Sequence, residues 1–451
     1  MSESSFNTVV VRDSRINDIS TKLDVIVAKG GAQNNYQTIN AYAPSNTNIN
    51  VNVVVPSENT IVDRAVTITS TVKLEVTIPA FTSYPTADAA DAKTAFKYGK
   101  TESLNQFPLN SMFSNSSVTI NQSNTSVNTR DMLHALIKMS SDESLNMYNC
   151  PHMSDKRFKL YSDTVVSQSN ALASYNESIG GEIPRGAHPV KIGVEVTRFG
   201  QATSALVESG TVIGNTAVTN ALTSTNNGDS WKVYVTFTTT EPLLFLSPFI
   251  YGKNNNNSAG LYGIRNMDFV FNIDSSAKGA FCSASPHNMT VKLVEFKDCS
   301  INVNYLTSQS SDLIASKNVV PYVDYARYIT SHAQVAVGAN FNITARKKIE
   351  AQKIQDSNSF LPMKSISINF NNVSGILASA SVMDLYNMSV ANGSKQDKYE
   401  FLGSATGITG FQVATTGSIL VIDPSRDMNL PDYLSNGSVG QFSFQPTIGF
   451  V

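Results

Sequence analysis

The stretch Glu241–Asp274, EPLLFLSPFIYGKNNNNSAGLYGIRNMDFVFNID, is the best indication of the fold class of this 451-residue chain. Near its beginning, Leu243–Leu246 is an apolar run that ends at Ser247-Pro248 and predicts a strand. The polar loop Lys253–Ser258 follows, and Met267–Ile273 then alternates apolar and polar residues with a period of two. The stretch therefore predicts a strand, a proline, a loop and a second strand.

The same order returns near the C-terminus. Ser418–Ile422 is an apolar run that ends at Asp423-Pro424, and it predicts another strand. The polar loop Leu430–Ser438 leads into Val439–Gln445, where polar and apolar residues alternate again. An ending that is used twice indicates a duplicated β-domain.

A second pattern also occurs twice, and it precedes the ending each time. The short alternating strand Ser117–Ile120 is followed by a polar turn and by a helix predicted over Asn128–Met139. The alternating strand Ser365–Phe370 is followed by a turn and by a helix predicted over Ser379–Met388. Two repeats in the same order favour duplication more strongly than either repeat alone.

The composition favours a β-protein whose outer faces are covered by neighbours. Only 15% of the residues are charged, compared with about 25% in an average globular protein. Lys and Arg number 33 and Asp and Glu number 35, which gives a net charge of -2. Binding to nucleic-acid phosphates needs clustered Lys and Arg. We therefore expect no direct, sequence-specific binding of nucleic acid.

The cysteines and the apolar runs bear on the compartment. Three cysteines, Cys150, Cys282 and Cys299, stand far apart in the sequence, so no disulfide framework can be read from them. We expect free thiols in a reducing compartment. No apolar run approaches the roughly 18 residues of a membrane span. The N-terminal residues lack the pattern of a signal peptide, so we expect synthesis and assembly in cytosol or nucleus.

The coarse organisation is an N-terminal arm followed by two β-domains. Residues 1–50 are polar and carry charges of both signs, and they predict the arm. Each remaining part holds about eight candidate strands, and strands with one wet and one dry face pack as two facing sheets. The predicted fold class is all-β, with two tandem eight-stranded jelly rolls (a double jelly roll) and short helices in the loops. We place the first jelly roll at 51–280 and the second at 281–451.

The sequence resembles a known family, the double jelly-roll major capsid proteins. That family includes adenovirus hexon and the coats of tailless double-stranded DNA phages, virophages and Polinton-like viruses. Four stretches carry the resemblance, and together they span both halves of the chain: Val55–Val76, Phe107–Met139, Glu241–Asp274 and Gly417–Gln445.

The resemblance implies a function as the major capsid protein of an icosahedral virus. It implies pseudo-hexameric homotrimeric capsomers, contacts with neighbouring capsomers, and penton and minor capsid proteins as further partners. It also implies that the protein is made in the host cytoplasm, assembled in the host cytoplasm or nucleus, and located in the virion.

No catalytic, cofactor-binding or metal-binding residue is predicted, and we do not expect an enzyme. The nearest approach to a metal pair is Cys150-Pro151-His152, but a structural zinc site needs four ligands. The sequence contains no P-loop, no G-x-S-x-G and no H-E-x-x-H motif.

Two charged pairs are the candidate subunit-interface residues. Asp63 and Arg64 lie between an apolar pair and a long strand, where a buried or interfacial ion pair is one interpretation. An exposed pair is the other interpretation, and it would contribute about 0–1 kcal/mol. Arg426 and Asp427 follow Pro424 at the end of a predicted strand.

Other functional classes stay open at this level. A tandem β-sandwich lectin or adhesin is the main alternative, because Asn/Asp-rich loops such as Lys253–Ser258 and Asp423–Asp432 are present. Such a protein would normally be secreted, and the signal-peptide pattern is missing. A single jelly-roll coat with a projecting domain is a third possibility, but such coats often carry a basic N-terminal arm.

Overall fold

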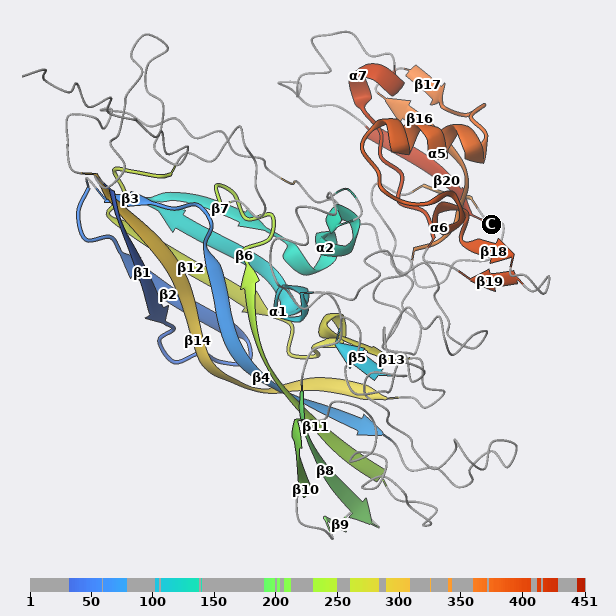
Figure 1. The fold of residues 1–451 in the computed structure, drawn as a ribbon. Helices are drawn as coiled ribbons and strands as arrows, with labels where there is room; N and C mark the ends of the chain where they lie inside the picture. Colours follow the sequence, from blue (N-terminus) through green and yellow to red (C-terminus); the bar gives the residue numbers. More distant parts are fainter. Residues whose placement is uncertain are drawn as a thin grey trace, which may run out of the picture.

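The computed structural model of the chain describes residues 32–58, 60–78, 102–104, 107–137, 139, 190–198, 201–202, 207–211, 230–249, 260–283, 289–308, 325, 340–342, 360–370, 373–406, 412–414, 417–428 and 444–450. Within these residues β-strands predominate, and the helices between them are short. The all-β prediction is therefore confirmed (Figure 1).

Eight strands from residues 32–308 form two antiparallel sheets, and we call this part the first barrel. Their bounds are β1 Ala32–Asn40, β2 Asn48–Val54, β4 Thr67–Ile78, β6 Phe113–Ile120, β7 Ser123–Val127, β11 Ser230–Pro242, β12 Asn266–Ile273 and β14 Thr290–Ser308. The larger sheet has the order β1-β14-β4-β11, and the smaller sheet has the order β2-β12-β6-β7. Beyond β11 the larger sheet continues with β8 (Lys191–Arg198) and β10 (Val207–Thr211).

The pairing of these eight strands is nested. The first strand pairs with the last, β1 with β14, and the second pairs with the seventh, β2 with β12. The third pairs with the sixth, β4 with β11, and the two middle strands, β6 and β7, pair with each other. A long hairpin folded over into two facing sheets is a jelly roll.

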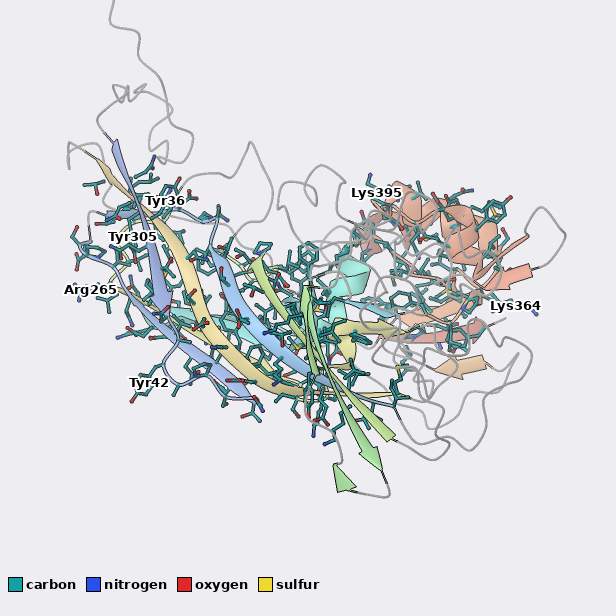
Figure 2. The ribbon with its side chains drawn as sticks, turned by 60° about the horizontal axis from the view of Figure 1, so that its bottom comes forward. Tyr36, Tyr42, Arg265, Tyr305, Lys364 and Lys395 are labelled. Atoms are coloured by element: carbon teal, nitrogen blue, oxygen red, sulfur yellow. The ribbon has the colours of Figure 1, made fainter. Side chains whose placement is uncertain are left out.

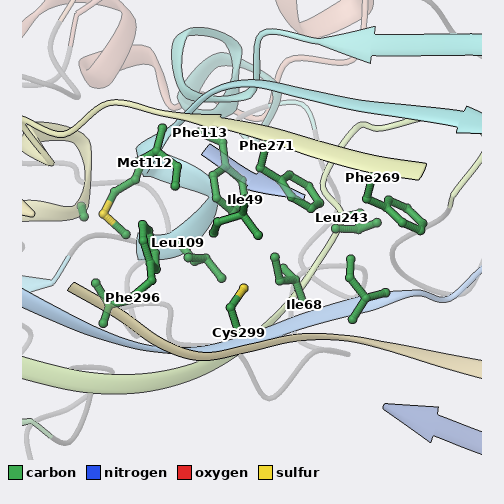
Figure 3. Close-up of a cluster of buried hydrophobic side chains, with 14 of the residues drawn as sticks. Ile49, Ile68, Leu109, Met112, Phe113, Leu243, Phe269, Phe271, Phe296 and Cys299 are labelled. Carbon is green, nitrogen blue, oxygen red and sulfur yellow. The ribbon is translucent and has the colours of Figure 1, made fainter. Parts of the chain in front are cut away.

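Alternating burial explains why the two sheets face each other. On β12, Met267, Phe269, Phe271 and Ile273 are buried, as the sequence predicts, while most residues between them are more exposed. Because successive side chains of a strand point to opposite faces, one whole face of each strand enters the core. Figure 3 shows Phe269 and Phe271 of this face between β12 and β6 on one side and β4 and β14 on the other.

Aromatic rings fill the middle of this core. The rings of Phe113 and Phe271 stack with centroids 4.8 Å apart, and Phe249 lies 5.4 Å from Phe269. Aromatic side chains bury large areas, so these rings supply much of the apolar surface that holds the two sheets together.

Shorter elements complete the first barrel. The helix α2 spans Thr129–Ile137, within the range predicted from the sequence. The remaining elements are β3 Thr60–Val62, β5 Glu102–Leu104, α1 Pro108–Met112, β9 Gln201–Ala202, the 3₁₀ helix η4 Lys278–Ala280 and β13 Phe281–Ser283.

Two predicted boundaries differ from what the sheets show. The strands β1 and β2 include residues that the sequence assigned to an arm over 1–50, and β1 forms nine consecutive pairs with β14. The strand β14 itself lies beyond the predicted division at 280, yet it occupies the larger sheet between β1 and β4. Its side chains Val291, Leu293 and Ile301 are buried in the core of the first barrel, which explains why it belongs there.

A second group of strands repeats part of this arrangement, and we call it the second module. Its sheet has the order β15-β20-β16-β17, with the same sequence order of strands as β2-β12-β6-β7. In both sheets a hairpin leads into a helix, from β6 and β7 into α2 and from β16 and β17 into α5. The predicted duplication of strand, turn and helix is therefore present in the structure. The bounds are β15 Asn340–Asn342, β16 Met363–Phe370, β17 Val373–Ile376, α5 Val382–Ala391, α6 Lys398–Leu402, β18 Ser404–Thr406, β19 Gln412–Ala414, α7 Pro424–Asp427 and β20 Phe444–Phe450.

The prediction that the two apolar runs form strands is wrong. Leu243–Leu246 forms a turn after β11, and Ser418–Ile422 is extended chain outside any sheet. Backbone groups of the second run bond to side chains instead of to a strand. Ile419 N donates to Gln396 Oε1 at 3.0 Å, and Val421 N donates to Ser389 Oγ at 3.1 Å.

Candidate functional site

The first predicted pair, Asp63 and Arg64, lies directly after β3. Arg64 is only 6% exposed, and its Nε donates a 2.6 Å hydrogen bond to the carbonyl oxygen of Pro248. Burial lowers the pKa of the Arg64 guanidinium. Asp63 Oδ1 accepts from the backbone N–H of Ala65 at 3.1 Å. Arg64 therefore fastens the loop 243–249 to the first barrel.

The same loop is fastened from the opposite sheet. Thr125 Oγ1 on β7 donates a 2.6 Å hydrogen bond to the carbonyl oxygen of Ser247. Leu243 N donates to the carbonyl oxygen of Val66, and Phe249 packs against the core ring of Phe269. The loop thus covers the β7 end of the smaller sheet.

Arg64→Met should lower the free energy of unfolding by about 1–3 kcal/mol, because the Pro248 carbonyl loses its charged donor. Methionine keeps a long apolar stem, so packing changes little. Chemical denaturation of the purified protein measures the loss, and Arg426→Met is the matched control. The guanidinium of Arg426 is half exposed, so the loss of its ion pair with Asp427 should change stability by only about 0–1 kcal/mol. An unchanged stability for Arg64→Met, together with an altered particle mass, would favour the interface role.

The second predicted pair, Arg426 and Asp427, lies in α7. Asp427 Oδ2 accepts from Asn392 Nδ2 at 2.5 Å and from Asp423 N at 2.8 Å, and Asp427 Oδ1 accepts from Arg426 Nε at 3.2 Å. Burial raises the pKa of Asp427, but the hydrogen bonds from Asp423, Asn392 and Arg426 outweigh it and the pKa is lowered. The pair closes α7 against the end of α5. A subunit-interface role for the two pairs stays a prediction.

A buried carboxylate that the sequence did not single out joins α1 to the larger sheet. Glu241, on β11, is fully buried, and its two oxygens accept from the backbone N–H of Leu109 at 2.8 Å and of Asn110 at 2.9 Å. Asn110 Nδ2 donates at 2.7 Å and Thr239 Oγ1 at 3.2 Å. Burial raises the pKa of Glu241 to about 7 against these four donors. The only signal in the sequence was a charged residue and a proline directly before the apolar run Leu243–Leu246.

Large apolar side chains are exposed at several places in the described residues, and two of these places hold more than one of them close in sequence. On the first barrel, Tyr36 is 77% exposed, Tyr42 is 89% exposed and Val54 is 68% exposed, and all three come from β1, β2 or the segment between them. Figure 2 shows Tyr36 beside β1 and Tyr42 beyond the C-terminal end of that strand. On the second module, Met383 and Val390 are exposed on α5. Exposed apolar groups of this kind mark interaction surfaces when they cluster.

Ligand-binding chemistry is not evident in the described part of the chain. Among those residues no group of three or more His, Cys, Asp or Glu side chains could hold a metal ion. Cys299 is a buried free thiol whose pKa burial raises to about 11. Cys150 and His152 lie outside the described residues. No helix within the described ranges is long and apolar enough to cross a membrane.

Family models match nearly the whole chain. Residues 4–316 match the model described as the first domain of the Sputnik virophage major capsid protein. Residues 305–450 match the model described as the C-terminal domain of the major capsid protein V20. A curated relative, the putative capsid protein V20 of Sputnik virophage, is 21% identical over 480 residues, which cover 97% of this chain and 73% of the relative.

Solved structures show the same fold. The cryo-EM structure of the Sputnik virophage matches with a TM-score of 0.68 and 20% identity, covering 100% of this chain and 88% of the matched chain. The crystal structure of the mavirus major capsid protein matches with a TM-score of 0.59 and 14% identity, covering 100% of this chain and 90% of the other. The fold shared with these neighbours is the double jelly roll.

Proposed function

The chain belongs to the family of virophage major capsid proteins, and from this premise we propose that three copies form a pseudo-hexameric capsomer of an icosahedral shell. Its capsid role follows from the family, as does its place in the virion. The trimer, the lattice and the partners beyond a second copy are parts of the proposal.

The repeated sheet order is the observation that carries the proposal. One chain contains β2-β12-β6-β7 and again β15-β20-β16-β17. In a trimer, every chain contributes two similar units, so six similar units surround the three-fold axis. Closed rings arise when unlike surfaces of neighbouring copies meet and the rotation closes. Such a block tiles a hexagonal lattice while it uses only three chains.

The same geometry suggests further partners. A block of six units fits positions with six neighbours, so a separate penton protein is expected to fill the five-fold vertices. Minor capsid proteins are expected to hold neighbouring capsomers together. Synthesis in the host cytoplasm and assembly there or in the nucleus complete the proposal.

We place the division between the two jelly rolls after β14 rather than at 280. In support, β14 pairs with β1 and β4, and the two family models meet at residues 305–316. Arg426 is the candidate interface residue with the most accessible charge. We propose no enzymatic activity, because members of a coat family act through their surfaces.

Light scattering after size exclusion, with electron microscopy of the same peak, tests the capsomer. The expected mass is three times that of one chain, and the expected outline is pseudo-hexagonal. A particle with the mass of one chain, at high concentration and across pH and salt, would contradict the trimer. Such a result would reopen the lectin alternative, which a glycan screen would then address.

A further inference from the structure

Among the described residues, β1 and β2 form an open edge of the first barrel. These strands end the larger and the smaller sheet, respectively. We call residues 32–54 the β1–β2 edge; none of them is Asp, Glu, Lys, Arg or His. The strand β1 forms nine consecutive pairs and β2 forms seven, and neither register is interrupted. Natural proteins normally block such edges with charges, prolines, bulges or short strands.

The other sheet ends in the described part of the chain do carry such protection. The strand β7 is covered by the loop 243–249 through Thr125 and Ser247. The strand β10 has five residues and an irregular register beside Ser209. The strand β17 has only four residues and also pairs irregularly. The β1–β2 edge therefore differs from these other sheet ends of the described residues.

The hydrogen-bond pattern shows which backbone groups this edge offers. Ala41 N donates to the carbonyl oxygen of Cys299 at 2.8 Å, so Ala41 faces β14. Antiparallel partners alternate between bonded and non-bonded positions. Counting back along the unbroken register, Ile39 and Gln37 also face β14, while the N–H and C=O of Thr38 and Tyr36 point away from it.

The same reasoning applies to β2. Val55 N donates to the carbonyl oxygen of Arg265 at 3.0 Å, so the backbone groups of Val54 and Asn52 point outward. The carbonyl of Asn50 already accepts from Tyr42 N at 3.3 Å. The two strands thus meet near this bond, and each offers outward backbone groups beyond it.

The side chains on this edge suit contact with protein. Tyr36, Tyr42 and Val54 are each more than two-thirds exposed. Tyrosine is enriched at protein interfaces, and charged residues are depleted at interface centres. A nucleic acid or a membrane surface would require Lys and Arg, which this edge lacks.

We propose that a strand of a second copy of this chain pairs with the outer edge of β1 and that the apolar side chains of the β1–β2 edge are covered by this contact within the capsomer. The inference rests on the proposed trimer. The second copy is the occupant that we infer, because the chain belongs to a family of capsid proteins and because an uncharged edge suits a partner in which only 15% of the residues are charged.

A matched pair of variants tests the contact. Tyr36→Lys/Val54→Lys places two ammonium groups on the β1–β2 edge, and neither replaced side chain contributes to the core. Val373→Lys makes the same kind of change on β17, an edge strand that the proposal leaves out, where Val373 is also exposed. Light scattering should show the double variant at the mass of one chain and Val373→Lys at three, with unchanged circular dichroism for both.

Residue-resolved hydrogen exchange of the wild-type trimer gives a second readout. If β1 is paired on both sides, the amides of Tyr36 and Thr38 should be protected like those of Gln37 and Ile39. Fast exchange at Tyr36 and Thr38 with slow exchange at Gln37 and Ile39 would show a free outer edge and overturn the proposal.

The outcomes separate this inference from the proposed function. A wild-type trimer that survives Tyr36→Lys/Val54→Lys overturns the inference and leaves the trimer intact. Equal loss of the trimer in Val373→Lys also overturns it, because the effect would not be specific to the β1–β2 edge. A wild-type protein that is monomeric overturns both.

Discussion

Gly417→Ala is expected to destabilise the second module by about 2–5 kcal/mol, from backbone strain of about 1–2 kcal/mol and overpacking of about 1–3 kcal/mol. Gly417 has φ +87°, a conformation that residues with a Cβ adopt at a cost. An added Cβ would also lie 2.7 Å from the carbonyl carbon of Phe360 and closer still to its oxygen. The backbone of one segment or the other would have to move.

Movement is restricted because this segment is bonded on both sides. The Gly417 carbonyl accepts from Gln396 Nε2 at 2.9 Å, and Ser418 Oγ accepts from Met363 N at 2.9 Å. Ser418 Oγ also donates to the carbonyl oxygen of Phe401 at 2.5 Å. A shift that relieved the clash would weaken these buried hydrogen bonds.

Gly375→Ala is the matched control for this prediction. Gly375 has φ +76°, but nothing lies within 4 Å of an added Cβ. It should therefore show only the backbone strain of about 1–2 kcal/mol. Denaturant unfolding, with hydrogen exchange of β16, would compare the two variants. Equal losses would contradict the close approach of Gly417 to Phe360.

Glu241→Leu is expected to destabilise the first barrel by at least about 3 kcal/mol, because each buried donor left without an acceptor costs about 1–3 kcal/mol. The substitution leaves the N–H groups of Leu109 and Asn110, and the side chains of Asn110 and Thr239, without the carboxylate that they contact. Leucine has a similar volume, so a cavity contributes little. The N-terminus of α1 should then separate from β11, which hydrogen exchange of residues 107–112 would report.

Glu241→Gln tests the pH dependence of the same site. Burial raises the folded-state pKa of Glu241 from 4.5 to about 7, so the folded protein holds the proton more tightly than the unfolded chain does. This contribution to stability is fully present below about pH 4.5 and is lost as the pH rises through about 7. The stability of the wild type minus that of Glu241→Gln should therefore fall between these pH values.

Taking the difference in stability between the two proteins removes the contributions of the other carboxylates to the pH dependence. Asp274 and Asp427 have lowered pKa values, because hydrogen bonds and nearby arginines outweigh burial, and they act in the opposite direction. They are common to both proteins, so their effects cancel. Carboxylates and His titrate between about pH 4 and pH 8. A difference in unfolding free energy that stays constant over this range would contradict the raised pKa of Glu241.

Local patterns were sufficient to predict the faces of strands and the duplication. The alternation in Met267–Ile273 is the burial pattern of β12, and the repeated strand, turn and helix became β6 and α2, then β16 and α5. The strands β7 and β17, which complete the two hairpins, were not predicted. These features depend on residues a few positions apart, which is the range over which periodicity carries information.

Features that depend on distant partners were missed. Ser418–Ile422 is apolar and extended like a strand, but its partners are side chains such as Gln396 and Ser389. Leu243–Leu246 is apolar because the loop is buried, with Leu243, Leu244 and Leu246 almost inaccessible. Glu241 became important only because α1 folds back onto β11. None of these contacts produces a periodic pattern of apolar and polar residues in the sequence.

The nested pairing of the first barrel also fixes an order of events during synthesis. The hairpin of β6 and β7 can form as soon as both strands leave the ribosome, whereas β1 must wait for β14, whose paired residues begin at Ser300. At about 5–20 residues per second, this wait lasts on the order of tens of seconds. During that time the uncharged strand β1 lacks β14, its one neighbour among the described strands. Nascent chains on one polysome are therefore most exposed to mispairing through β1, the first strand of the described residues, and the risk ends only when β14 arrives.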